Sequence, residues 1–339
     1  MKYKVVSIDI AKNVFQVCGL DQHNKPAFNK KIPRAKLLET IAQLNCDSVV
    51  MEACYASNPW GRAIESLGFK VNLIPPYQVK PFLVGNKNDH NDAIAIAEAS
   101  QRPTARFVPV KTLEQQDIQS LNRIRERLVK HRTSAINQLR GLLSEYGVIA
   151  PKGPNQLLEN IPRILEDGEN SLTPIAREFV QDLQLEIIEA NKKIEQNETK
   201  TIALLKTKPS YELLQTVRGI GPITAAAIIA SVNDGKQFKN GRNMAAWLGL
   251  TPSQYASGEK CITGGITKRG NAQLRKLFIH GARAVINWCE KKEDSFSCWI
   301  KGLLARMHPC KAIVAVANKI ARMAWAVLTK QEAYNPSLA

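Results

Sequence analysis

The chain has 339 residues, enough for two or three domains, and 44% of them are hydrophobic and 23% charged. This ordinary globular composition excludes a disordered or fibrous protein. Lysine and arginine total 47 against 30 aspartate and glutamate residues, which gives a formal net charge of +17. Such an excess favours a nucleic-acid partner, because cations that bind phosphates release counterions. The alternative is a merely basic protein.

Membrane and secretory classes are not expected. The N-terminal segment lacks the charged-then-apolar order of a signal peptide, and the most apolar stretch, residues 312–328, is interrupted by Lys319 and Arg322. The seven cysteines are odd in number and include no Cys-x-x-Cys pair, which disfavours a disulfide framework or a zinc ribbon. We therefore expect no membrane partner and a reducing, prokaryotic cytoplasm, with activity at the nucleoid.

The first part, residues 1–110, is predicted to be an α/β domain. β-rich runs at 3–10, 14–20, 47–51 and 69–74 alternate with helical patterns at 37–44, 59–67 and 92–99. The polar residues 21–25 follow the second run, so the first strands are expected to form antiparallel hairpins. Alternating strands and helices predict a mixed sheet that is covered on both faces.

The middle part, residues 111–209, is predicted to be all-α. Apolar residues recur at three- and four-residue spacing along two long segments, which are separated by a turn region at 150–173. The pattern is typical of an antiparallel coiled-coil hairpin, or alternatively of a plain helical bundle. This part is nearly neutral, so it suits spacing or dimerisation better than chemistry.

The last part, residues 210–339, contains 18 lysines and arginines against 7 acidic residues, a net charge of +11. It is predicted to be helical, with a helix pair around residues 219–221, a flexible loop at 251–271, and helices at 272–289 and 311–329. We expect it to carry most of the electrostatic attraction to nucleic acid.

Four carboxylates are candidate metal ligands. Asp9 and Glu52 end predicted strands, and Asp89 and Asp92 lie three residues apart at a helix start, so they face the same way. Carboxylates at strand ends are costly to bury without a cation, and this set suits Mg²⁺, with Mn²⁺ as a substitute. The alternatives are structural: Asp9 closes a turn, Asp89 caps the helix, and Glu52 pairs with Arg62.

Two basic, glycine-containing segments are candidate phosphate sites. The segment around Arg218, Gly219 and Gly221 resembles a helix–hairpin–helix element, in which exposed amides at a helix start hold a phosphate, although a turn that only packs two helices is the alternative. In the predicted loop and the helix start after it, the residues expected to contact phosphate are Lys260, Lys268, Arg269 and Arg275. Chemistry alone does not identify a nucleophile in this loop, because no nearby histidine supplies a base.

Taken together, these segments resemble the insertion-sequence 110 family of transposases. Asp9 in residues 8–12, Glu52-Ala53, and Asp89 and Asp92 in residues 88–93 resemble the family's Asp-Glu-Asp-Asp signature. The similarity continues through residues 219–221, 238–252, 255–258 and 267–275, and the length suggests the 1111 branch. Cys54 and Tyr55 depart from the Thr-Gly or Ser-Gly expected after Glu52-Ala53.

The resemblance implies a fold of three parts: an N-terminal RuvC-like (RNase H-like) domain, a coiled-coil helical hairpin, and a C-terminal helical transposase domain. It implies a recombinase whose nucleophile is Ser257, or failing that Ser253, and which forms a covalent phosphoserine bond with DNA. It also implies that an element-encoded bridge RNA pairs with target and donor DNA, and that protomers of a dimer or tetramer share active sites. The competing interpretations are a hydrolytic RuvC-like nuclease or junction resolvase, and a non-catalytic nucleic-acid-binding protein.

Overall fold

The computed structural model describes residues 1–86 and 88–335 and divides into two compact units, residues 1–114 and 115–339. The first boundary lies close to the predicted one at residue 110. The second predicted boundary, at residue 209, does not separate compact units. Ile118 and Leu205, from the two long middle helices, are buried in the same hydrophobic cluster as the C-terminal helices, so these segments fold together.

Unit 1 is built on a mixed five-stranded sheet in the order β4-β3-β2-β6-β7. β2 pairs antiparallel with β3 and β3 with β4, whereas β6 and β7 continue the sheet in parallel, as the alternation of strands and helices predicted. A separate two-stranded sheet joins β1 to β5. The strands are β1 (Lys2–Tyr3), β2 (Val5–Asp9), β3 (Val14–Leu20), β4 (Pro26–Pro33), β5 (Asn45–Cys46), β6 (Val49–Glu52) and β7 (Val71–Ile74).

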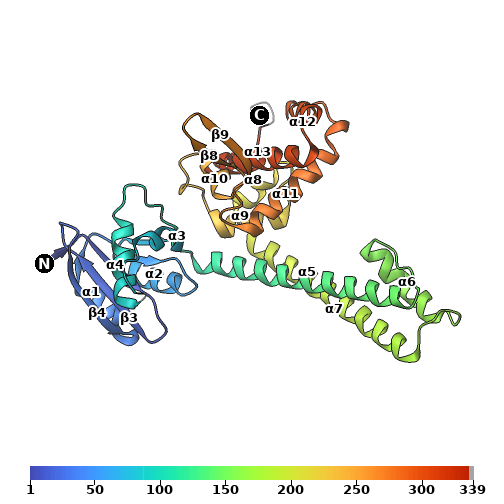
Figure 1. Ribbon diagram of the computed structural model, residues 1–339, viewed down its shortest axis with the longest axis horizontal. Helices are drawn as coiled ribbons and strands as arrows, with labels where there is room; N and C mark the ends of the chain where they lie inside the picture. The colour runs from blue at the N-terminus through green and yellow to red at the C-terminus, as the bar shows by residue number, and fades with distance from the viewer. Residues whose placement is uncertain (87, 336–339) are drawn as a thin grey trace. The chain divides into compact units, whose positions relative to one another are not determined.

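Both faces of this sheet are covered, because its strands are buried on both sides. One face packs on α4, whose alanines allow a close approach, and the other packs on α1 and α2 through a cluster that includes Phe15, Leu37 and Ile64. Figure 1 shows α4 beside the sheet. The helices of unit 1 are η1 (Arg34–Lys36), α1 (Leu37–Ala42), α2 (Ser57–Glu65), α3 (Pro76–Val79), η2 (Lys80–Phe82) and α4 (Asp89–Ser100).

Two long antiparallel helices, α5 (Leu113–Glu145) and α7 (Pro174–Leu205), form the middle of the chain. Arg125 on α5 contacts Glu198, and the later residue Arg132 contacts the earlier Asn191, so the helices run in opposite directions (Figure 1). The prediction of a turn region at 150–173 was wrong in part, since this segment contains α6 (Pro154–Glu166). Proline at the first position of α6 is compatible with a helix start, and buried leucine and isoleucine side chains attach α6 to α7.

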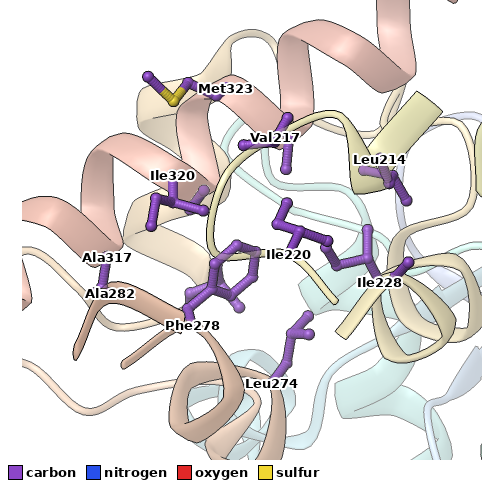
Figure 2. Close-up of a cluster of buried hydrophobic side chains, with 14 of the residues drawn as sticks. Leu214, Val217, Ile220, Ile228, Leu274, Phe278, Ala282, Ala317, Ile320 and Met323 are labelled. Atoms are coloured by element: carbon purple, nitrogen blue, oxygen red, sulfur yellow. The ribbon is translucent and has the colours of Figure 1, made fainter. Parts of the chain in front are cut away.

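The C-terminal region is a helical bundle around one hydrophobic cluster. Figure 2 shows Val217 and Ile220, from the turn between two helices, in the same buried cluster as Phe278 and Ile320. The expected flexible loop at 251–271 is instead largely a β-hairpin, and two helices, α10 and α12, were not predicted. The elements are α8 (Pro209–Gln215), α9 (Pro222–Val232), α10 (Gly241–Trp247), β8 (Pro252–Ser257), β9 (Lys260–Ile266), α11 (Ala272–Asn287), η3 (Cys289–Lys291), α12 (Ser295–Arg306) and α13 (Pro309–Lys330).

α13 is long and apolar enough to span a membrane by length and composition. However, it packs against α8, α10 and α11, and residues such as Val316, Ile320 and Ala324 are fully buried there. Its apolar face is therefore accounted for by the core of unit 2.

Candidate functional site

The sheet of unit 1 places two of the predicted acids side by side. Ile8 and Met51 are paired in the parallel β2–β6 ladder, and Asp9 and Glu52 are the next residues on the two strands. Val5 and Val50, which precede the acids by an even number of residues, contact α4, so both carboxylates point toward the α4 face of the sheet. The ends of two adjacent parallel strands thus bring Asp9 and Glu52 together.

The start of α4 supplies the other two acids. Asn88 caps the helix by accepting a hydrogen bond from the amide of Asn91 at 2.8 Å, and Asp89 and Asp92 lie in the first turn. Two contacts hold this turn on the sheet: the buried Ser7 hydroxyl donates to the Ala93 carbonyl at 2.6 Å, and the Asn29 amide donates to the His90 carbonyl at 3.0 Å. Sequence reasoning missed Ser7 and Asn29, because nothing local in the chain indicates their distant partners.

The electrostatics show that the four acids act on one another. Burial, together with charge repulsion from Asp92, Asp89 and Glu52, raises the pKa of Asp9 to about 6. Burial likewise raises the pKa of Glu52, with a second contribution from Asp92. Like charges this close favour either a proton or a cation between them, so the cluster has the electrostatic character of a cation site.

The chemistry of the cluster fits a hard divalent cation. Its donors are carboxylate oxygens, which Mg²⁺ and Mn²⁺ prefer. Within the described residues, no three histidine, cysteine, aspartate or glutamate side chains come close enough to enclose an ion. Mg²⁺ itself needs only one or two protein carboxylates, because water and substrate phosphate oxygens fill its other positions.

The structure gives other partners for two of the structural alternatives, in which Asp89 caps α4 and Glu52 pairs with Arg62. The cap of α4 is Asn88, so Asp89 is not needed for that role. The guanidinium of Arg62 donates to the carbonyl of Lys111 at 2.6 Å, which gives this side chain a function in joining α2 to the end of unit 1.

The predicted nucleophile lies at the tip of the β8–β9 hairpin in unit 2. Ser257 pairs with Lys260 across the two-residue connection Gly258-Glu259, and both paired side chains are exposed. Gly258 has a φ of +55°, the conformation that a tight hairpin turn requires at its first central position. The hairpin therefore presents a serine hydroxyl and a lysine at an exposed tip.

Ser253, the fallback nucleophile, has a different environment. Its hydroxyl donates to the carbonyl of Gly265 on the opposite strand at 3.0 Å, which occupies it in holding the hairpin together. Both serines are exposed, and Ser253 is the one whose hydroxyl is engaged in this hydrogen bond.

The base of the hairpin is basic and is held by hydrogen bonds. The turn at Gly249 contacts the turn at residues 268–270, since the amide of Lys268 donates to the Gly249 carbonyl at 3.2 Å. Arg275 donates to the carbonyls of Leu248 and Arg269, both at 3.0 Å, so its guanidinium braces the turn. Lys268 and Arg269 remain exposed at this base and are available to phosphate.

The glycine turn between α8 and α9 serves packing first. Gly219 has a φ of +89°, and a Cβ added to Gly281 would lie 2.0 Å from the carbonyl oxygen of Gly219, so only glycines allow this approach to α11. Arg218, predicted to bind phosphate, forms an ion pair of 2.5 Å with Asp294. Gly221, which precedes α9, is exposed. It is therefore accessible enough for the predicted phosphate contact.

Comparison with known proteins identifies relatives along nearly the whole chain. A family described as "Transposase IS116/IS110/IS902 family" matches residues 211–297, and a second transposase family, of the Asp-Glu-Asp-Asp type in this group, matches residues 6–148. The transposase for insertion sequence element IS1111A of Coxiella burnetii is 44% identical over 98% of this chain and 91% of its own length. A probable family 20 transposase of Pseudomonas aeruginosa is 41% identical over 99% of this chain and 100% of its own length. The transposase for insertion sequence element IS1328 of Yersinia enterocolitica is 34% identical over 96% and 97%.

Proposed function

Because the chain belongs to the IS110 family of insertion-sequence transposases, which are DNA recombinases, we propose that it cleaves, exchanges and rejoins DNA strands through a covalent phosphoserine bond. The observation that carries this proposal is the placement of Asp9 and Glu52 at adjacent strand ends that face α4, whose first turn carries Asp89 and Asp92. An exposed serine at the tip of the β8–β9 hairpin complements it.

Asp9, Glu52, Asp89 and Asp92 would hold the divalent cation, and their side chains would have to draw closer together around it than they stand in this structure. Bound there, Mg²⁺, or Mn²⁺ in its place, supplies stabilisation of the negative charge that develops on the reacting phosphate. The protein's own contribution is geometric, because the β2 and β6 ends and the clamped first turn of α4 keep the carboxylates on one face before the ion arrives. The strand order of the sheet supports a RuvC-like domain for this part.

Ser257 performs the covalent step. Its oxygen forms a bond to the scissile phosphorus, the bond from phosphorus to one DNA oxygen breaks, the hydroxyl proton is lost, and the departing oxygen takes up a proton. The phosphodiester is conserved as phosphoserine, so a DNA hydroxyl can reverse the step and rejoin strands without ATP. Lys260, opposite Ser257 on the hairpin, and Lys268 and Arg269 at its base position the phosphate.

Nucleic acid and a second protomer are the proposed partners. The excess positive charge of residues 210–339 suits backbone contacts to target and donor DNA and to a guide RNA. RNA guidance rests on family resemblance, in which base pairing supplies sequence choice and the protein holds the backbone. The α5–α7 pair is proposed to join protomers in a dimer or tetramer, in which the acids of one chain and Ser257 of another form one site.

A covalent-adduct assay separates this proposal from its rivals. Incubated with Mg²⁺, its guide RNA and labelled donor DNA, the protein should form an adduct that survives denaturing electrophoresis. Ser257→Ala should abolish the adduct and Ser253→Ala should retain it, whereas Asp92→Asn should lose both cleavage and adduct.

The other outcomes identify the rivals. Cleavage that persists in Ser257→Ala indicates a hydrolytic nuclease that uses water. Salt-sensitive binding without any Mg²⁺-dependent strand breakage by the unmodified chain indicates a non-catalytic binding protein.

A further inference from the structure

Gln16 lies beside the acidic cluster, although nothing in the local sequence marks it. It pairs with Asp9 in the antiparallel β2–β3 ladder, and residues directly opposite in such a ladder point to the same face of the sheet. That is the face covered by α4, because Cys18, two residues further along β3, packs against α4. The Gln16 side chain is only 4% exposed.

A chain of hydrogen bonds fixes which way the Gln16 carboxamide is turned. The carbonyl of His90, in the first turn of α4, can only accept, so Asn29 must offer it its amide nitrogen, at 3.0 Å. The Asn29 oxygen then faces Gln16 and accepts from its amide nitrogen at 2.5 Å. An inverted Gln16 or Asn29 would bring two acceptors together, so the orientation is determined by the network.

This orientation leaves the Gln16 oxygen without a protein partner. The atom is buried and accepts no hydrogen bond from any of the described residues. In the Gln16 carboxamide, the oxygen branches away from the nitrogen that bonds Asn29 on β4. The strand on the other side of β3 is β2, which carries Asp9. A buried acceptor without a donor is destabilising by about 1–3 kcal/mol, so such an atom calls for an explanation.

We propose that Gln16 is a positioning residue of the acidic cluster, whose amide oxygen accepts a hydrogen bond from a water molecule on the metal ion held by Asp9 and its neighbours. This inference rests on the metal site of the proposed function. The water supplies the missing donor to Gln16, and Gln16 orients the water. Through Asn29 and His90, the same side chain also connects that water to the helix turn that carries Asp89 and Asp92.

The test measures Mn²⁺ affinity of the full chain without nucleic acid, by the electron paramagnetic resonance signal of the free ion. Gln16→Met keeps the length of the side chain but removes both amide atoms, and it should weaken Mn²⁺ binding by about 10-fold, the effect typical of residues that support metal ligands. Gln16→Glu retains an acceptor oxygen and should bind Mn²⁺ at least as tightly as the unmodified chain. Both variants lose the hydrogen bond to Asn29, so the midpoint temperature of thermal unfolding without metal should be lowered in both.

Gln78→Met is the matched control. The Gln78 carboxamide is also bonded at both ends, to the carbonyl and amide of Arg106 at 2.8 and 2.9 Å, but it is not part of the acidic cluster. This variant should lose stability and keep its Mn²⁺ affinity, which separates general destabilisation from loss of the metal-bound water.

Three results would overturn the inference in distinguishable ways. Unchanged affinity in Gln16→Met, with weakened affinity in Asp92→Asn, leaves the metal site intact but refutes the role of Gln16. Equal weakening in Gln16→Met and Gln16→Glu shows that Gln16 only clamps α4. Unchanged Mn²⁺ affinity in Asp92→Asn refutes the proposed metal site, and the proposed role of Gln16 falls with it.

Discussion

Asp9→Asn is expected to stabilise unit 1 of the metal-free protein at neutral pH while abolishing strand exchange. In the folded chain the pKa of Asp9 is about 6, against an ordinary value of 3.8, because of burial and the neighbouring acids. A carboxyl group whose pKa is raised on folding contributes its full stabilisation below about pH 3.8, and this contribution is lost as the pH rises through about 6. At neutral pH the ionised Asp9 therefore opposes folding, and an uncharged asparagine does not.

The size of the effect follows from the pKa. The shift corresponds to at most about 3 kcal/mol. Because Asp9 is only half-buried, solvent screening reduces the expected gain in the free energy of unfolding to about 1–2 kcal/mol. Added Mg²⁺ should offset the repulsion in the unmodified chain, and its stabilising effect should be smaller in Asp9→Asn.

Hydrogen exchange followed by mass spectrometry measures this gain in peptides from residues 1–114 of the full chain, in EDTA, between pH 4 and pH 7.5. The gain in Asp9→Asn should be small at pH 4 and should grow across the interval. Asp47→Asn is the control, since Asp47 is an exposed acid paired with Lys2 at 2.7 Å, and it should show no such growth. An Asp9→Asn variant that is less stable than the unmodified chain at pH 7.5, or a gain that does not depend on pH, would refute the repulsion argument.

Three further substitutions test the C-terminal region. Gly270→Ala should lower the free energy of unfolding by more than about 2 kcal/mol in a thermal melt, because φ is +76° and the new Cβ would lie 1.9 Å from the Trp247 carbonyl oxygen. Gly265→Ala is the control, because this glycine faces open space, and the free energy should change by no more than about 0.5 kcal/mol. Ser253→Ala should cost at most about 1 kcal/mol, because it removes one exposed hydrogen bond, and a larger loss would mean that the hairpin depends on it. Asp294→Ala should cost about 1–2 kcal/mol, because Asp294 caps α12 as well as pairing with Arg218, and an unchanged melting temperature would contradict both roles.

The sheet of unit 1 was largely predictable, because its cause is local. β-rich runs separated by helical spacing, and a polar turn at residues 21–25, were sufficient to predict a mixed sheet with antiparallel first strands. The acids that end two of its strands follow from the same pattern, since the ends of parallel neighbours meet at one edge. The pairing of β2 with β6, which places Asp9 next to Glu52, joins segments about forty residues apart and was settled only by folding.

The β8–β9 hairpin could not be read from hydrophobic periodicity. Both of its strands are exposed on both faces, so no alternation of apolar and polar residues marks them, and their glycines, serines and threonines favoured a loop. α6 was missed for a related reason, because its prolines resemble turn signals, while its buried residues become visible as a helical face only against α7.

Sequence by itself determined the classes of side chain available to this protein: a basic surface, a set of carboxylates at element ends, and a serine beside a glycine. Tertiary structure decided which of these are free to react. Arg218 is paired with Asp294, Ser253 is bonded across its hairpin, and the buried Gln16 oxygen is left without a partner among the described residues. The physical reason is that a hydrogen bond or ion pair depends on distance in space, and partners 12 to 76 residues apart along the chain are brought together only when the fold is complete.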